Sequence, residues 1–134
     1  MVSLHPNGVS LVSAGLACTV SLWDIRKLKD SRNKINTRRS QRPITVYNGG
    51  RSVNSAFFSP SGTHLVSTTQ DNKLDMFRKF HLSSSKASTK PIKSILHDNK
   101  TGRWLTTFQA VWHPNLDIFG VGSMAKPRSV ELFD

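Results

Sequence analysis

The sequence predicts an all-β chain made of repeated units of short strands. One proline turn occurs three times, and Pro6, Pro60 and Pro114 stand 54 residues apart. Each turn is followed by a run that ends on an aromatic residue, at position 23, 77 or 133, and no segment shows a sustained helical period. Repeats of this length built from strands are typical of stacked or radial β architectures, which mostly bind partners.

The length of the chain bounds how much of such an architecture it can form. A closed ring needs about four to eight blades, and 134 residues are too few for that number. We therefore expect a β-propeller fragment of about two and a half four-stranded blades from a ring of about seven. A piece of this kind leaves apolar faces uncovered at both ends, because each repeat buries its faces against its neighbours.

Alternating and apolar runs between turn signals locate the expected strands. The strands are expected at 9–13, 19–23, 44–47, 53–58, 65–69, 74–77, 92–96, 108–112, 118–121 and 130–133. The resulting division of the chain is a partial blade at 1–28, a basic inter-blade loop at 29–43, a blade at 44–82, a Ser-rich loop with a strand and an inserted hairpin at 83–107, and a partial blade at 108–134.

The charge of the chain predicts a polyanionic partner. Nineteen Lys and Arg against eight Asp and Glu give a formal net charge of +11, which favours nucleic acid. The segment 26–42 alone holds eight basic residues and is either a solvated linker or a phosphate-attracting and nuclear-targeting segment. A membrane partner is not expected, because no amphipathic helix carries the charge.

Enzyme chemistry and cofactor binding are not expected. The single cysteine, Cys18, permits no internal disulfide and no cysteine-based zinc cluster. His5 and His113 occupy equivalent turns and so belong to the repeat rather than to a metal site. No catalytic triad, phosphate loop or pair of acids in a shared pocket is recognisable, so we predict no catalytic residue, no metal and no cofactor.

The repeated unit resembles the WD repeat. The copy at 52–77 reads SVNSAFFSPSGTHLVSTTQDNKLDMF, the copy at 4–24 reads LHPNGVSLVSAGLACTVSLWD, and the third begins FQAVWHPNLDIFGVG at 108. The resemblance implies four-stranded propeller blades in which the aromatic residue at 23, 77 or 133 fills the core between adjacent sheets. The aspartate of the family's strand-to-strand turn has a counterpart at Asp71, but Ala17 replaces it in the first copy and Pro127 stands near its place in the third.

A narrower resemblance covers residues 15–134. The runs TGRWLTTFQAVW and VGSMAKPR are not part of the generic repeat, and with RSVNSAFFSPSG they are similar to the group of damaged-DNA-binding protein 2 and WD repeat protein 76, nearer to the second. The resemblance implies a nuclear protein of the DNA damage response that binds duplex or damaged DNA. It also implies a substrate receptor of a cullin-4 ubiquitin ligase, with the chemistry done by partners.

A Trp-Asp-x-Arg box is the candidate adaptor site. Trp23 and Asp24 end a blade, and Arg26 follows two positions later. In the resembling receptors this box docks on the damaged-DNA-binding protein 1 adaptor, where an arginine reaches an acidic or carbonyl partner. The alternative is an arginine that follows the blade without such a role.

The segment before the third turn is the candidate DNA-binding hairpin. Lys100 and Arg103 would hold phosphates, which supplies affinity without sequence choice. Trp104 is either an aromatic wedge that enters the minor groove, at the cost of unstacking, or a core residue packed on the next blade.

Three further cations are DNA-binding candidates. Arg51, Lys126 and Arg128 stand on loops at strand ends that could border the same face, or each is a solvated surface charge.

The alternative function is a chromatin-associated interaction scaffold without direct DNA contact, whose partners would be histones, other chromatin proteins or an acidic peptide of a histone chaperone. An RNA-binding role agrees with the charge but has no aromatic platform motif.

Overall fold

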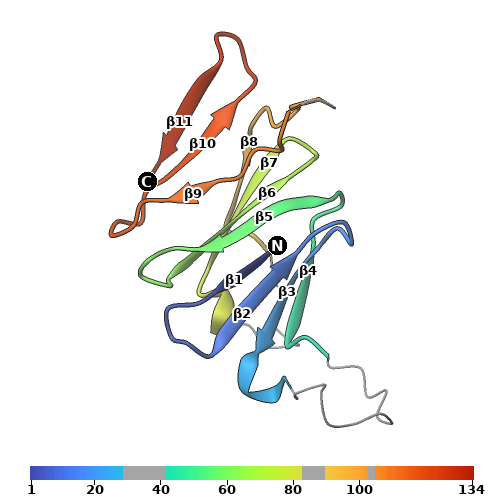
Figure 1. Cartoon of the computed structure of the whole chain (residues 1–134), viewed down its shortest axis with the longest axis vertical. Coiled ribbons are helices and arrows are strands. Elements are labelled where there is room, and N and C mark those ends of the chain that lie inside the picture. The colour runs from blue at the N-terminus through green and yellow to red at the C-terminus, as the bar shows by residue number, and fades with distance from the viewer. Residues whose placement is uncertain (29–41, 83–89, 103–104) are drawn as a thin grey trace.

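The computed structural model describes residues 1–28, 42–82, 90–102 and 105–134. These residues form three antiparallel sheets and two 3-10 turns, at Ile25–Lys27 and Phe80–Leu82. The sheets follow one another along the chain and lie in a row, the first at one end and the third at the other (Figure 1). The predicted all-β repeat architecture is confirmed.

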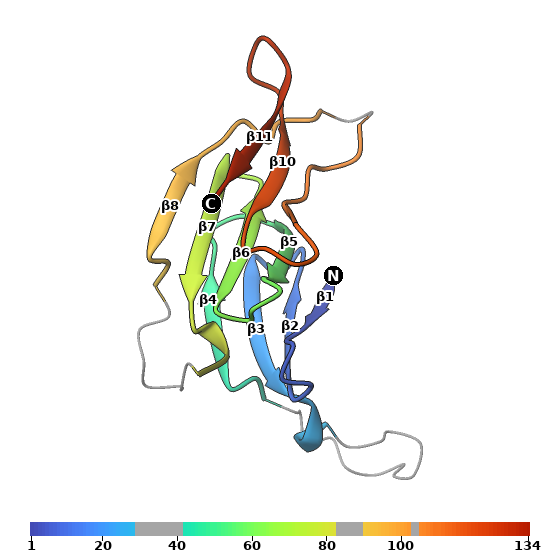
Figure 2. The same ribbon diagram turned by 90° about the vertical axis from the view of Figure 1, so that its left-hand side faces the viewer.

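Each sheet is a simple antiparallel succession of strands. The first consists of β1 (Val2–Leu4), β2 (Ser10–Ala14), β3 (Thr19–Asp24) and β4 (Thr45–Asn48). The second consists of β5 (Val53–Phe58), β6 (His64–Thr69), β7 (Lys73–Arg78) and β8 (Lys93–Leu96), and Figure 2 shows β8 beside β7 at its outer edge. The third consists of β9 (Val111–Trp112), β10 (Phe119–Ser123) and β11 (Ser129–Phe133).

The first two sheets each end one strand later than the division expected from the sequence. The strand expected at 44–47 is β4, which pairs with β3 through Ser21 and Val46 and so closes the first sheet. In the same way β8 closes the second sheet by pairing with β7. Each sequence repeat therefore begins with the last strand of the preceding sheet, and the expected boundary between 43 and 44 falls inside the first sheet.

The three proline turns share one backbone hydrogen bond. In each, the amide of the residue before the proline donates to the carbonyl oxygen five positions later: His5 to Ser10 (2.9 Å), Ser59 to His64 (2.9 Å) and His113 to Ile118 (2.7 Å). Gly8 and Gly62 both have the positive φ, 67° and 73°, that favours glycine. The 54-residue sequence spacing thus corresponds to one recurring structural element.

Two apolar clusters hold the three sheets together. The first joins Val12, Val20 and Leu22 of the first sheet to Leu65 and Phe77 of the second. Between the second and third sheets lies another cluster, formed by Val66, Leu74, Ala110, Phe119 and Val121. Phe77 in the first cluster and Phe133 against the second fill the gaps between sheets, as expected.

Trp23 differs from its two counterparts. Successive side chains of a strand point to opposite faces, and because Leu22 packs toward the second sheet, Trp23 lies on the outer face of the first. There its Nε1 donates to Ser13 Oγ at 2.9 Å. No sheet formed by the described residues covers this face, so the expectation that Trp23 fills an inter-sheet core is not met. Apolar residues are exposed on the outer faces of both end sheets, with Leu4 60% and Leu132 74% accessible.

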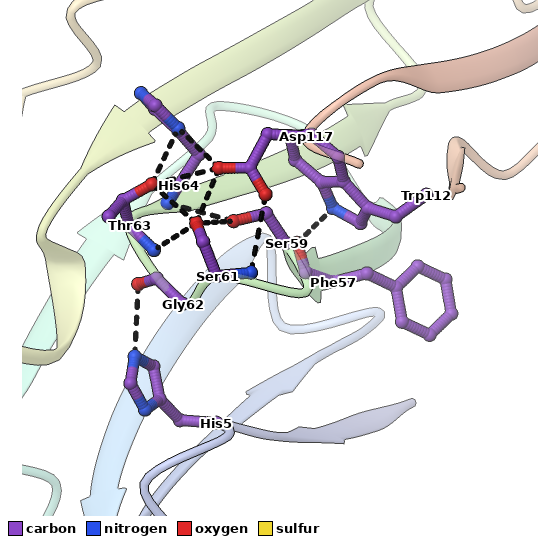
Figure 3. A network of polar contacts seen from close by, with 9 residues as sticks. All are labelled: His5, Phe57, Ser59, Ser61, Gly62, Thr63, His64, Trp112 and Asp117. Atoms are coloured by element: carbon purple, nitrogen blue, oxygen red, sulfur yellow. Dashed lines mark hydrogen bonds and ion pairs between the residues drawn. The ribbon is translucent and has the colours of Figure 1, made fainter. Parts of the chain in front are cut away.

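Polar contacts link the three turns in a row (Figure 3). His5 Nδ1 accepts from Asn7 N, so its Nε2 donates, and it does so to Gly62 O at 2.9 Å. On the other side, the Asp117 carboxylate accepts hydrogen bonds from Ser61 N (3.2 Å), Ser61 Oγ and Thr63 Oγ1 (2.9 Å). Burial acts to raise the pKa of Asp117, but these bonds outweigh it and lower the pKa to about 2.

Candidate functional site

The strand connections gather on two opposite faces. The connections β2–β3, β4–β5, β6–β7, β8–β9 and β10–β11 form one, here called the loop face, along the upper right of Figure 1. The three proline turns and the described ends of the connections β3–β4 (25–28 and 42–44) and β7–β8 (79–82 and 90–92) form the other, called the turn face. Backbone hydrogen bonds join successive connections of the loop face: Gly49 N to Cys18 O (2.8 Å), Gln70 N to Ser52 O (2.9 Å), His97 N to Asn72 O (3.0 Å) and Met124 N to Asp98 O (3.1 Å).

Four of the six predicted DNA-binding residues lie on the loop face. Arg51 is on the β4–β5 connection, Lys100 on the β8–β9 connection, and Lys126 and Arg128 on the β10–β11 connection. All four are exposed, and none forms an ion pair within the residues that the structure describes. The other two, Arg103 and Trp104, lie outside the described residues.

One further cation of this face is already neutralised. Lys73 Nζ lies 3.0 Å from the Asp71 carboxylate, which also accepts a hydrogen bond from Thr69 Oγ1. Burial acts to raise the pKa of Asp71, but the bonds from Thr69 and Lys73 lower it overall. The pair therefore supports the β6–β7 turn and leaves Arg51, Lys100, Lys126 and Arg128 as the charges open to a partner.

The Trp-Asp-x-Arg box forms a rigid corner on the turn face, at the end of β3. Asp24 is buried and caps the 3-10 turn by accepting from Arg26 N at 3.0 Å. The Arg26 guanidinium donates hydrogen bonds to both oxygens of the same carboxylate, from Nε (3.0 Å) and from Nη2 (2.8 Å). These hydrogen bonds lower the pKa of Asp24 to about 2. The Arg26 side chain is nevertheless 69% exposed, so the guanidinium that bonds to Asp24 is also accessible to a partner.

Sequence reasoning missed polar contacts that join the first sheet to the second and tie the β8–β9 connection to the second sheet. Tyr47 Oη donates to Asp75 Oδ2 at 2.9 Å, and Ser94 Oγ donates to the other oxygen of the same buried carboxylate. Asn99 reaches back to donate to the carbonyl oxygens of Thr69 and Lys73. These partners lie 19 to 30 residues apart, on different strands or on the β8–β9 connection, so no local sequence pattern predicts the contacts.

The described ranges, 1–28, 42–82, 90–102 and 105–134, show neither a metal-binding cluster nor a membrane-spanning helix. No cluster of three or more His, Cys, Asp or Glu is placed to hold a metal ion. No helix there is long and apolar enough to cross a membrane.

Comparison with known proteins identifies the repeat. The family model "WD domain, G-beta repeat" matches residues 41–77. WD repeat-containing protein 76 of Mus musculus is 44% identical over 98% of the chain, and its Xenopus laevis counterpart is 35% identical over 98%. DNA damage-binding protein 2 of Gallus gallus is 32% identical over 92% of the chain.

The chain spans only part of these relatives: 20% of the mouse protein, 21% of the frog protein and 24% of the chicken protein. The family match begins in the residues just before β4, which agrees with repeats that start on the closing strand of the preceding sheet. Residues 41–77 therefore match a WD repeat, the three antiparallel sheets agree with a fragment of a WD-repeat propeller, and the chain is similar to WD repeat-containing protein 76 and DNA damage-binding protein 2.

Proposed function

We propose that the chain is part of a nuclear WD-repeat protein that binds DNA through the loop face and acts in the DNA damage response. The observation that carries the proposal is the gathering of Arg51, Lys100, Lys126 and Arg128, exposed and without ion pairs among the described residues, on one face. The names of the relatives, which include DNA damage-binding protein 2, support it. The second part of the proposal is that the turn face docks on the damaged-DNA-binding protein 1 adaptor of a cullin-4 ubiquitin ligase.

The chemistry of the loop face suits the phosphate backbone. Cations that neutralise phosphates release counterions and supply affinity that does not depend on base sequence. Lys100 and Arg103 both precede the candidate wedge Trp104 in the sequence, and insertion of the wedge would cost least at a damaged, poorly stacked step. The hydrogen bonds between successive connections hold Arg51, Lys100 and Lys126 in one array.

The two faces would serve two partners at once. Arg26 lies on the turn face, and the candidate DNA-binding cations lie on the opposite one. A protein built this way can hold DNA and the ligase adaptor together and direct ubiquitin transfer to proteins nearby. The chain itself then needs no catalytic residue.

A salt titration of DNA binding tests the first part. The affinity of the full chain for a short duplex should fall linearly on a log–log plot against salt, with a slope of about −0.9 for each phosphate contacted, hence roughly −4 for four contacts. Fluorescence anisotropy at several salt concentrations measures it. No binding at low salt would instead favour the alternative, a chromatin-associated scaffold without direct DNA contact.

Replacement of Arg26 tests the second part. Arg26→Ala should abolish co-purification of the chain with the adaptor. The change removes the exposed guanidinium and with it the two hydrogen bonds that the guanidinium donates to the Asp24 carboxylate. Lys27→Ala is the matched control, since Lys27 is an exposed cation on the same 3-10 turn and should be dispensable. Equal recovery of the adaptor with Arg26→Ala and the unmodified chain would limit the box to a structural role.

A further inference from the structure

Two histidines from different sheets stack where the first proline turn meets the second sheet. The imidazole rings of His5, in the β1–β2 turn, and His81, in the 3-10 turn after β7, lie 4.0 Å apart between centroids, tilted by 40°. His5 is 7% exposed, and its ring also meets Phe58 edge-on at 4.7 Å. Gly62 permits this close approach, because a Cβ at that position would collide with the His5 ring. The first sheet thus rests on the second through a packed pair of imidazoles.

Main-chain hydrogen bonds require His5 to be neutral. Its Nδ1 accepts from Asn7 N at 2.9 Å, and its Nε2 donates to Gly62 O at 2.9 Å (Figure 3). These partners cannot exchange roles, since an amide N–H only donates and a carbonyl oxygen only accepts. A proton added at Nδ1 would point at the Asn7 N–H, and the turn would lose that bond. The ring therefore keeps both bonds only as the neutral imidazole.

His81 is also held in the neutral form. Burial lowers its pKa, and the neighbouring His5 and Lys79 lower it further, while a hydrogen bond with the Gly62 backbone acts in the opposite direction without outweighing them. The His81 Nδ1 is buried and has no hydrogen-bond partner within the part of the chain that the structure describes. Two imidazolium ions stacked at this distance would repel each other, so the pair resists double protonation.

The charges around the pair do not favour an imidazolium. The other titratable or charged groups on the elements packed around it are the cations Arg78 and Lys79 and two closed pairs, Asp24–Arg26 and His64–Asp117. In each closed pair the carboxylate is already bonded to its own partner. Neither His5 nor His81 has a carboxylate partner in an ion pair among the described residues.

We infer that the stacked pair His5–His81 is a pH-sensitive switch in the contact between the first and second sheets. Above the ordinary histidine pKa of about 6.5, both rings are neutral in the folded and in the unfolded chain, and the contact contributes its full stability. As the pH falls through that value, the unfolded chain takes up protons that the folded pair excludes, so stability is lost. Protonation separates the first proline turn from the second sheet. The switch goes beyond the proposed function, because it involves neither DNA nor the adaptor.

Urea unfolding of the full chain at pH 7.5 and pH 5.5 tests the inference. A histidine that stays neutral in the folded chain lowers the equilibrium constant for folding about tenfold between these two values. His81→Phe keeps an aromatic ring against His5 but cannot be protonated. The fall in the folding constant on acidification should therefore be about tenfold smaller in this variant than in the unmodified chain.

A matched pair of variants tests the role of His5. His5→Asn supplies an oxygen that can accept from Asn7 N and takes up no proton in this range, so it should also reduce the pH dependence about tenfold. His113→Asn is the same change in the equivalent turn, where the Nδ1 accepts from Asn115 N and Leu116 N. Because His113 is exposed and its charged form is solvated, we expect this control to alter the pH dependence less than about threefold.

NMR of the ¹⁵N-labelled imidazole nitrogens gives a readout that does not depend on unfolding. His5 should appear as the neutral Nε2–H form at pH 7.5, and its protonation on acidification should coincide with faster solvent exchange of the Asn7 amide. An imidazolium or Nδ1–H form of His5 at pH 7.5, or a pH dependence of folding unchanged by His81→Phe, would overturn the assignment. DNA binding by these variants at pH 7.5 should persist, so the switch and the proposed function fail separately.

Discussion

Phe77→Ala is expected to lower the free energy of unfolding by about 3–5 kcal/mol. Phe77 is 2% exposed and packs edge-on against Tyr47 (4.8 Å between ring centroids) and Phe80 (5.1 Å), at the centre of the cluster that joins the first two sheets. Its removal leaves a cavity that rigid sheets cannot close. Because a domain is stable by only about 5–15 kcal/mol, a urea unfolding curve should show a large decrease in midpoint.

Trp23→Ala is the matched comparison, because Trp23 stands at the equivalent place one repeat earlier. Its side chain lies on the uncovered face of the first sheet and makes one hydrogen bond, to Ser13. We expect Trp23→Ala to lower the free energy of unfolding by about 1–2 kcal/mol, because it removes that hydrogen bond and the partial burial of the ring. An equal or larger loss of stability for Trp23→Ala than for Phe77→Ala would contradict the arrangement of the sheets.

Removal of three loop-face cations is expected to weaken duplex binding about 100-fold at physiological salt. The triple variant Arg51→Ala, Lys100→Ala, Arg128→Ala takes one charge from each of three connections of that face. If each contacts a phosphate, the slope of log affinity against log salt should also decrease in magnitude by about 2.7. Fluorescence anisotropy with an unmodified and a lesion-bearing duplex measures both quantities.

A second triple variant removes the same charge from the turn face. Arg42, Arg78 and Lys90 are exposed and lie on the β3–β4 and β7–β8 connections or their margins. Their replacement by alanine lowers the net charge equally, and we expect less than about a threefold loss of affinity, because distant charges are screened. Equal losses from the two triple variants would mean that net charge alone, and no particular face, attracts DNA.

The repeat was predictable from the sequence because its period determines local backbone geometry. Residues 54 apart adopt matching conformations even where their side chains differ: Cys18 and Asn72 have φ values of 60° and 62°. The sheet that each closing strand joins was not predictable, because β4 pairs with β3 across a long insertion and its pattern fits either neighbour. The outward position of Trp23 also depends on which sheets flank its own, which no local pattern encodes.

The sequence likewise predicted some features of the candidate sites and not others. The Trp-Asp-x-Arg box was recognised from its sequence and the family resemblance, but the fork that Arg26 forms with Asp24 inside the chain was not predicted. From their places at strand ends, Arg51, Lys126 and Arg128 were predicted either to border one face or to be solvated surface charges. The approach of His97 to Glu131 was not predicted, because Glu131 lies 34 residues further along the chain and comes near the ring only when the sheets pack.

The most direct test of DNA binding by the loop face is a hydrogen-exchange footprint of the full chain with a short duplex. Bound DNA should slow amide exchange in segments 49–52, 97–102 and 124–128. Exchange in the proline turns at 5–8, 59–62 and 113–116 should stay unchanged, because they lie on the opposite face. Protection of the proline turns with the loop face unaffected would contradict the account.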